Sequence, residues 1–188
     1  TDPSFRDSEL EESWLLGLLS DLQQAYEPQV ISVISPVRLN GLRGWELVGE
    51  DQYYQLQIDQ VKPDKKIRNL IQRAERECIV ESDQTFDCRY KKLVNEFLKT
   101  HRVSVETRSI FKRLPRISKN PGCVLISAFN QHRKLVAFDV FDFSAAHTGF
   151  YLFNFYSRRH YVPGASDLLL SHGIQLAHQQ GKKILNLG

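Results

Sequence analysis

The sequence predicts a layered α/β fold in which a mixed, mostly antiparallel sheet carries helices on both faces. Residues 124–156 contain three successive runs of β-forming residues separated by short turns, the pattern of a meander. These runs are apolar on both faces, so we expect the sheet to be covered on both sides. A helix then separates the third run from a last short strand at 184–187, and such a crossover favours a parallel pair within the sheet.

Length and composition fit a folded chain of one domain or two small lobes. The 188 residues carry 25 Lys and Arg against 22 Asp and Glu, a formal charge of +3, and 41% of them are hydrophobic. These values exclude a disordered chain, and so small a net charge does not by itself indicate a nucleic-acid partner. No apolar run approaches the ~20 residues of a membrane span. The three cysteines lack C-x-x-C spacing, which indicates a reduced, cytoplasmic setting without a disulfide framework.

The N-terminal part predicts one helix followed by short strands. Ser8 and Glu11 have the spacing of a capping box, the leucines that follow repeat with a helical period, and Pro28 ends the helix. Strands are expected at Val30–Val37, Trp45–Val48 and Tyr53–Ile58. We therefore expect a small lobe at 1–60 before a larger lobe at 61–188.

The larger lobe is expected to begin with a helix that is apolar on one face and basic on the other. Its segment, Lys62–Arg76, is the most basic element of the chain. Contact with tRNA or an anionic lipid is one interpretation of this face, and a solvated surface is the other. The elements expected after it are helices near Tyr90–Phe97 and Glu106–Leu114 (ended by Pro115), strands at Val124–Phe129, Leu135–Phe143 and Thr148–Tyr156, a helix near Leu169–Ala177 ended by Gly181, and a strand at Ile184–Leu187.

The junction between the third strand of the meander and the next helix carries the strongest functional signal. Gly164 and Ala165 would let a ligand approach the backbone closely, and Ser166 is a natural N-cap. The free N–H groups of the first helical turn would receive an anion such as a phosphate. Arg158 and Arg159 would add positive charge beside it. The alternative is a well-capped helix with surface arginines.

Around this junction the chain resembles a known family. Residues 156–188 contain R-R-H-Y-V-P-G-A-S-D-L-L-L and then G-K-K-I-L-N-L-G, and residues 65–76 read K-x-x-R-N-x-x-x-R-A-E-R. This ordered set resembles the GNAT acyltransferase superfamily, and more narrowly its FemAB-like and phosphatidylglycerol-lysyltransferase-like branch. The resemblance covers roughly Val61 to Gly188. Because this branch often duplicates its lobe, the residues before it would be a partial second GNAT-like lobe.

The resemblance implies transfer of an acyl or aminoacyl group from a phosphate-bearing donor to an amine, on a small molecule or a peptide. The superfamily's usual Q/R-x-x-G-x-G/A loop is not in register, since Val162 stands where its first Gly should follow Arg159. The donor therefore stays open between acyl-CoA and aminoacyl-tRNA. The family's next helix and last strands, which often carry the general acid, would follow Gly188. The backbone amides that would bind the donor's phosphates are those of Val162, Gly164, Ala165 and Ser166.

Polar side chains within the aromatic strands are the candidate catalytic groups. Such a transfer needs a base, a hydrogen-bond donor for the oxyanion and a proton for the leaving group. Asp139 and Asp142 lie on opposite faces by strand alternation, and burial would raise the pKa of either and suit it to act as a base. Asn154 is polar among Phe and Leu, and Tyr156 ends its strand. For each residue the alternative is a hydrogen bond to a neighbouring strand end or arginine.

Other chemistries find little support in the sequence. His172 and His178 are six residues apart on one expected helix, so they do not share a face, and no metal site is predicted. The alternative to an enzyme is a non-catalytic ligand-binding module on the same fold, which would keep the anion-binding helix start and lack the chemistry.

Overall fold

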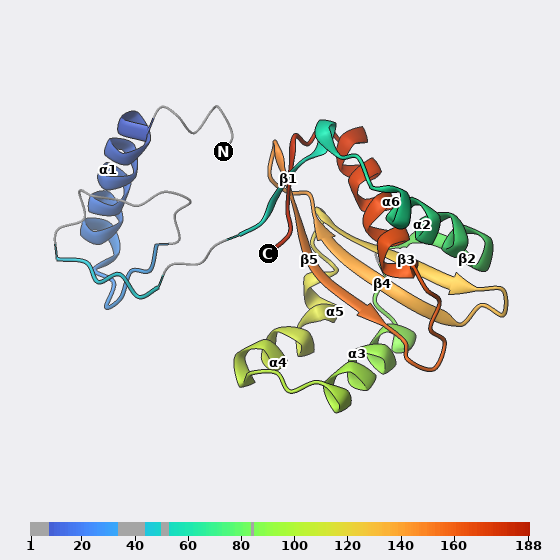
Figure 1. The fold of residues 1–188 in the computed structure, drawn as a ribbon. Helices are drawn as coiled ribbons and strands as arrows, with labels where there is room; N and C mark the ends of the chain where they lie inside the picture. Colours follow the sequence, from blue (N-terminus) through green and yellow to red (C-terminus); the bar gives the residue numbers. More distant parts are fainter. Residues whose placement is uncertain (1–7, 34–43, 50–52, 84) are drawn as a thin grey trace. The chain divides into compact units, whose positions relative to one another are not determined.

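The structure, a computed structural model, describes residues 8–33, 44–49, 53–83 and 85–188 (Figure 1). The chain divides into two compact units, Thr1–Asp51 and Gln52–Gly188. In the described part of the first unit, helix α1 (Ser8–Tyr26) is followed by irregular backbone. Helix α1 confirms the first predicted helix, whereas the side chains of its expected capping pair lie outside the described residues.

Two of the strands predicted near the N-terminus are wrong where the structure describes them. Residues 30–33 and 45–48 are not in strands, and the rest of the run predicted at Val30–Val37 lies outside the described residues. Val30 is 82% exposed and Val48 is 94% exposed. A run of β-forming residues becomes a strand only when a neighbour pairs with it and buries one face. The assignment of 1–60 and 61–188 to separate lobes stays a prediction.

The second unit is built around a six-stranded sheet in the order β1-β6-β5-β4-β3-β2 (Figure 1). Its strands are β1 (Gln55–Gln57), β2 (Cys78–Asp83), β3 (Cys123–Asn130), β4 (Leu135–Asp142), β5 (Thr148–Tyr156) and β6 (Ile184–Asn186). Neighbouring strands are antiparallel except β5 and β6, which are parallel and joined by the crossover helix. This confirms the predicted mixed, mostly antiparallel sheet. Strand β1, expected in the N-terminal lobe, instead pairs with β6 at the edge of this sheet.

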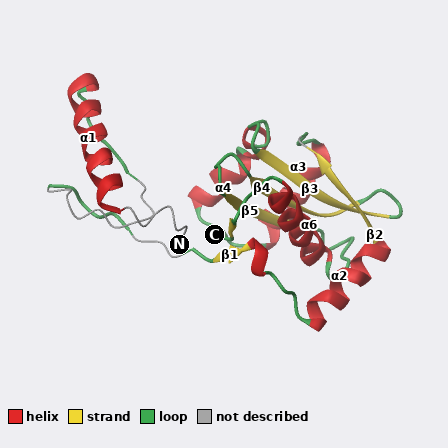
Figure 2. Ribbon diagram, turned by 90° about the horizontal axis from the view of Figure 1, so that it is seen from above, coloured by secondary structure: helices red, strands yellow, loops and turns green. Residues whose placement is uncertain are grey.

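Helices cover both faces of the sheet, as predicted (Figures 1 and 2). One face carries α2 (Lys65–Glu77) and α6 (Ala165–Gln179), and the other carries α3 (Cys88–Thr100), α4 (Val105–Lys112) and α5 (Leu114–Ile117). A single 3-10 turn, η2 (Ile58–Gln60), leads from β1 toward α2. Pro115, expected to end a helix, lies in the first turn of α5, where proline is tolerated. Among the helices that the structure describes, none combines the length and the apolar composition of a membrane span.

Successive residues of β4 point into two separate hydrophobic layers. Ala137 and Phe141 pack in the layer beneath α2 and α6, and Phe138 and Val140 pack in the layer beneath α3, α4 and α5. The second layer is rich in aromatic rings, such as Tyr90 and Phe138, whose centroids lie 5.0 Å apart in an edge-to-face contact. The double burial of β4 explains why its sequence is almost continuously apolar.

Helix α6 packs very closely on the sheet. A Cβ atom added at Gly173 would overlap the ring of Phe141, so only glycine permits this approach. At its C-terminal end Gly181 has a φ of 72°, and the amide of Lys182 donates to the carbonyl of Ala177 at 2.9 Å. This geometry confirms the predicted C-terminal glycine cap.

We expect thiol reactivity to report this layering. Burial, followed by the carboxylates of Glu77 and Asp142 respectively, raises the pKa of Cys78 and that of Cys123 to about 11. Cys88 is exposed. Because the thiolate is the nucleophile, iodoacetamide should alkylate Cys88 roughly 100-fold faster than the other two in the native protein, as read by peptide mass spectrometry. Similar rates are expected after unfolding in guanidinium, and similar rates in the native protein would contradict the packing.

Candidate functional site

Strand β5 runs on beyond its pairing with β6. The register between them ends at Phe150 and Asn186, whereas β5 continues to Tyr156. After Asn186 the chain continues the pairing with the β1 side, where the amide of Leu187 donates to the carbonyl of Tyr54 at 2.8 Å. Within the described residues, the last part of β5 is therefore paired only with β4. We call this part, which is paired on one side only, the one-sided end of β5. The loop that leads to α6 starts there.

The start of α6 lies against helix α2. Gly164 caps α6 with a φ of 83°, and a Cβ atom there would overlap the carbonyl of Leu70 on α2. Glycine is therefore required by the left-handed backbone and by the contact between the two helices. This corrects the expectation that Gly164 leaves room for a ligand, because protein atoms fill that space. Ser166 is also not the N-cap but the second residue of the helix, and its hydroxyl bonds to Asn154.

The first turn of α6 offers two free backbone amides. The amide of Ala165 donates to the carbonyl of Val162 at 3.2 Å, and that of Leu168 donates to Gly164 at 2.9 Å. The amides of Ser166 and Asp167 have no acceptor among the residues that the structure describes. Of the amides expected to bind an anion, that of Ala165 is thus already engaged.

These residues border a cavity of about 270 Å³, which we call the smaller cavity. Its lining residues are Val136, Tyr156, Tyr161, Val162, Gly164, Ala165, Ser166 and Asp167. Five residues predicted for the site therefore lie around one space. Asp167 is the charged side chain of this lining.

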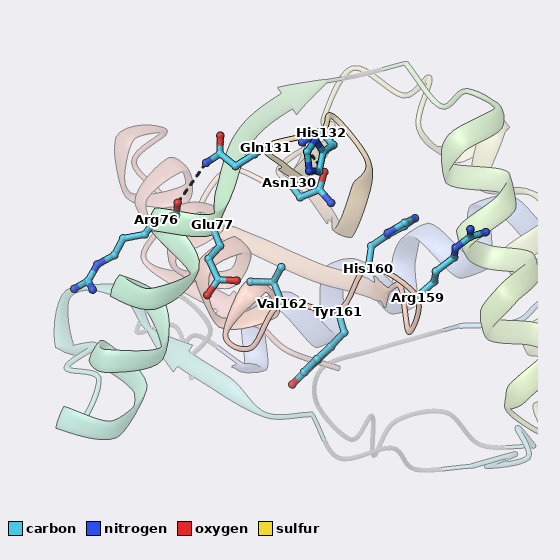
Figure 3. Close-up of a pocket in the computed structure, with 9 residues that line it drawn as sticks. All are labelled: Arg76, Glu77, Asn130, Gln131, His132, Arg159, His160, Tyr161 and Val162. Carbon is cyan, nitrogen blue, oxygen red and sulfur yellow. Dashed lines mark hydrogen bonds between the residues drawn. The ribbon is translucent and has the colours of Figure 1, made fainter.

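The larger cavity, of about 430 Å³, adjoins the smaller one and shares Tyr161 and Val162 with it (Figure 3). Its other lining residues are Arg76, Glu77, Asn130, Gln131, His132, Arg159 and His160. Figure 3 shows Arg159 and His160 on one side and His132, from the turn between β3 and β4, on another. Four of the lining residues, Arg76, His132, Arg159 and His160, are arginine or histidine, which gives this cavity a different character from the smaller one.

Glu77, the carboxylate that lines the larger cavity, is paired with a basic residue. Glu77 forms an ion pair with Arg73 at 3.1 Å. No carboxylate pairs with Arg159 in the described part of the chain. The side chain of Arg76 points away from the other residues in Figure 3, and its carbonyl accepts a hydrogen bond from Gln131 at 3.3 Å.

Two polar residues singled out by the sequence lie elsewhere. Arg158 lines neither cavity, and its amide donates to the Glu96 carboxylate at 2.8 Å. Asp142 accepts a hydrogen bond from the amide of Ser144 at 2.7 Å and so holds the turn after β4. This hydrogen bond gives Asp142 a structural role at the end of its own strand.

A buried hydrogen-bonded chain connects the middle of the sheet to the start of α6. The Asn154 side-chain amide donates to Asp139 Oδ1 at 2.6 Å and to Ser166 Oγ at 3.1 Å. The Ser166 hydroxyl in turn donates to Asn154 Oδ1 at 3.3 Å. The three residues come from β4, β5 and α6, so strand pairing and the crossover helix bring them together.

Asp139 is a carboxylate placed inside a hydrophobic layer. It is 0% exposed, and its Oδ2 atom has no hydrogen-bond partner among the described residues. Burial raises the pKa of Asp139 and outweighs the lowering by the Asn154 hydrogen bond and the nearby Tyr151 hydroxyl, so that the pKa is about 7. Asp139 lines neither cavity, so it reaches the smaller cavity only through Asn154 and Ser166.

Comparisons with known proteins give the fold of the chain but no close relative. No family model matches the sequence, and no curated protein matches it. The structure of L-PGS from Bacillus licheniformis matches with a TM-score of 0.55 at 18% identity, over 72% of this chain and 45% of that one. The C-terminal DUF2156 domain of a putative lysylphosphatidylglycerol synthetase from Agrobacterium fabrum matches with a TM-score of 0.52 at 15% identity, over 72% and 45%. The chain has a GNAT-like fold.

This match confirms the resemblance inferred from the sequence, at the level of the fold. A tandem GNAT protein from the clavulanic acid biosynthesis pathway is also similar, with a TM-score of 0.47 at 12% identity over 71% of this chain and 42% of that one. The GNAT-like chain spans less than half the length of these solved structures.

Several lining residues were not foreseen from the sequence. Asp167 and Tyr161 lie within the segment that resembles the family, but no spacing rule marks them. His132 and His160 come from two loops that are 28 positions apart in the chain and meet only in the fold. Side chains on separate loops give no periodic signal, so sequence patterns alone could not pair them.

We expect Gly164→Ala to destabilise the protein more than Gly181→Ala does. Both glycines have positive φ, at 83° and 72°, so each replacement carries a left-handed strain of about 1–2 kcal/mol. At Gly164 the new Cβ would also overlap Leu70, whereas at Gly181 no atom of the described residues lies within 4 Å of it. Urea unfolding should show a further loss of roughly 1–3 kcal/mol for Gly164→Ala. Equal losses would contradict the contact between α6 and α2.

We expect the buried carboxyl of Asp139 to make stability depend on pH. Its pKa is raised from 3.8 to about 7, so between these values the native protein binds more protons than the unfolded chain. The free energy of unfolding should therefore fall as the pH rises, by roughly 2–3 kcal/mol between pH 5 and pH 7.5 from this group. Asp139→Asn lacks this ionisable group. The free energy of unfolding of the variant relative to the wild type, measured with urea at both pH values, should therefore be higher at pH 7.5 than at pH 5. Parallel pH profiles of the two proteins would show that Asp139 ionises normally.

Proposed function

We propose that this protein transfers an acyl or aminoacyl group from a phosphate-bearing donor to an amine. The supporting observation is that the one-sided end of β5 and the free amides of Ser166 and Asp167 border one cavity. The GNAT-like fold, similar to that of a lysylphosphatidylglycerol synthetase, favours this class of reaction. Because function depends on the site and not on the scaffold, the transferase remains a proposal that needs direct measurement.

The two cavities suggest how the donor would lie. Its phosphates would occupy the larger cavity, beside Arg159, His160 and His132, because the Glu77 carboxylate in the same lining is paired with Arg73. Its acyl end would enter the smaller cavity at the start of α6. The carboxylate of Asp167 in that cavity disfavours phosphate there, which revises the anion site expected from the sequence.

A tRNA donor would extend naturally along the basic helix. The segment Lys62–Arg76 includes all of α2 except its last residue, and Arg76 borders the larger cavity. A polyanion with one end in that cavity would therefore pass over the exposed basic face of α2. Acyl-CoA, which is much shorter, would not need this face. The free thiols are consistent with a reduced compartment, and we propose a cytoplasmic location.

The proposed mechanism is direct attack of the amine nitrogen on the acyl carbonyl carbon. The amides of Ser166 and Asp167 would donate hydrogen bonds to the oxyanion as it forms. When the bond from carbon to the leaving oxygen or sulfur breaks, the hydroxyl of Tyr156 would give its proton to the leaving group and recover one from the amine. Asp139 would act as a positioning residue, because Asn154 and Ser166 separate it from the cavity.

We expect a phosphate-bearing donor to raise the melting temperature of the protein, and Arg159→Gln to weaken that effect. Thermal shift with CoA, acetyl-CoA and aminoacyl-tRNA would identify the donor. Loss of one unpaired arginine from the larger cavity should weaken donor binding roughly fivefold to tenfold. Arg158→Gln is the matched control, because it removes the same charge one position away and lines neither cavity.

Turnover distinguishes the enzyme from a binding module. The donor that binds would be incubated with a panel of amines, and modified amine would be measured by mass spectrometry. If the donor binds and no amine is modified, the protein is the ligand-binding module that the sequence left as the alternative. If no donor binds, or if both arginine variants bind it equally well, the proposed donor site is wrong.

A further inference from the structure

The smaller cavity has the chemistry of a site for a cation. Asp167 carries the negative charge of its lining, and among the described residues no lysine or arginine lines it. Tyr156 and Tyr161 border the same space, with ring centroids 6.1 Å apart at an interplanar angle of 65°. A carboxylate next to tyrosine rings attracts an ammonium group through charge and through the electron-rich ring faces. The Asp167 carboxylate would repel a phosphate, although the free amides of Ser166 and Asp167 border the same cavity.

Ser166 is left as a hydrogen-bond acceptor by its contacts with Asn154. Its hydroxyl hydrogen is donated to Asn154 Oδ1 at 3.3 Å, and one of its lone pairs receives the Asn154 amide at 3.1 Å. A serine hydroxyl has one hydrogen and two lone pairs, so what remains is one lone pair. Because Ser166 lines the smaller cavity, that lone pair is available to an N–H group of a ligand.

Asp139 determines this arrangement. Its carboxylate accepts a hydrogen bond from Asn154 Nδ2 at 2.6 Å and so favours the amide orientation with Nδ2 on the Asp139 side. Both ends of this amide contact Ser166, Nδ2 at 3.1 Å and Oδ1 at 3.3 Å. An isosteric amide at 139 would remove this preference, since it could bond to either end of Asn154. A buried carboxylate with one oxygen unpartnered is a costly feature in an apolar layer. Orienting Asn154 and Ser166 gives that feature a role.

The negative field extends to a neighbouring side chain on β5. Burial raises the pKa of Tyr151, and the charges of Asp139 and then Asp167 raise it further. Two carboxylates, one buried and one at the cavity, therefore act on the same region from β4 and from α6. An ammonium group would offset both charges, and Asp167 in the first turn already counters the helix dipole.

We infer that the smaller cavity binds a primary ammonium group, held by the Asp167 carboxylate and the Ser166 oxygen and covered by Tyr156 and Tyr161. The inference rests on the proposed function in one respect. The group would belong either to the acceptor amine or to the amino group of an aminoacyl donor. Binding of the ammonium group is nevertheless measured without donor and without turnover.

The test is an NMR titration of the 15N-labelled protein at constant ionic strength. The probes are n-propylammonium chloride, alaninamide hydrochloride and neutral n-propanol. We expect both ammonium probes to shift the amides of residues 156–167 and to bind at least tenfold more tightly than n-propanol. Equal binding of n-propylammonium and n-propanol would overturn the inference with the wild-type protein alone, without any variant.

Variants then locate the ammonium group. Asp167→Asn should weaken n-propylammonium at least tenfold, and Ser166→Ala should weaken it about threefold. The matched control is Asp59→Asn, which removes a carboxylate paired at 3.4 Å with His178 at the surface and away from the cavity. Unchanged binding by Asp167→Asn, or equal loss in both aspartate variants, would overturn the inference. Tighter binding of inorganic pyrophosphate than of n-propylammonium at these amides would also overturn it and restore the anion site.

The two ammonium probes distinguish the source of the group. Alaninamide carries a carbonyl next to its ammonium group, as an aminoacyl donor does, and n-propylammonium resembles a simple acceptor. Tighter binding of alaninamide supports the donor, and equal binding supports the acceptor. Ammonium binding without any transfer would refute the proposed function and leave this inference standing. Transfer without ammonium binding would support the proposed function and refute this inference.

Discussion

The close packing of helix α6 against both α2 and β4 is the constraint on which the other features depend. Gly173 lets the helix approach the ring of Phe141, and Gly164 lets its first turn approach the carbonyl of Leu70. Because the helix is held at both points, the free amides of Ser166 and Asp167 lie near the end of β5 that is no longer paired with β6. A side chain at either glycine would move α6 outward and separate those amides from the end of the strand.

The chain of hydrogen bonds from Asp139 to Ser166 adds a polar connection to this apolar packing. Burial of an unpaired carboxylate is unfavourable, and an apolar residue at 139 would suit the layer better. Strongly perturbed carboxyl groups occur often at functional sites, although structural networks produce them too. Here the perturbed carboxyl group of Asp139 is connected by hydrogen bonds through Asn154 to Ser166, which lines the smaller cavity. This connection favours the functional interpretation.

The two adjoining cavities differ in charge, and this difference limits what a shared ligand can be. Arg159, His160 and His132 border one, and Asp167 borders the other. Tyr161 and Val162 line both cavities. A molecule that spans both would be anionic at one end and uncharged or cationic at the other. Acyl and aminoacyl donors with a phosphate group have this form, and a uniformly anionic ligand does not.

Helix period, caps and strand alternation were enough to locate most elements of the sheet unit and to place Asp139 and Asp142 on opposite faces, because these signals come from neighbours in the chain. Pairing depends on distant residues. The run at 45–48 does not form a strand, whereas β1 pairs with β6 at the far edge of the sheet. For the same reason the contact of Gly164 with Leu70, and the chain from Asp139 to Ser166, emerged only in three dimensions. Residues from separate elements meet there through packing, which no local pattern encodes.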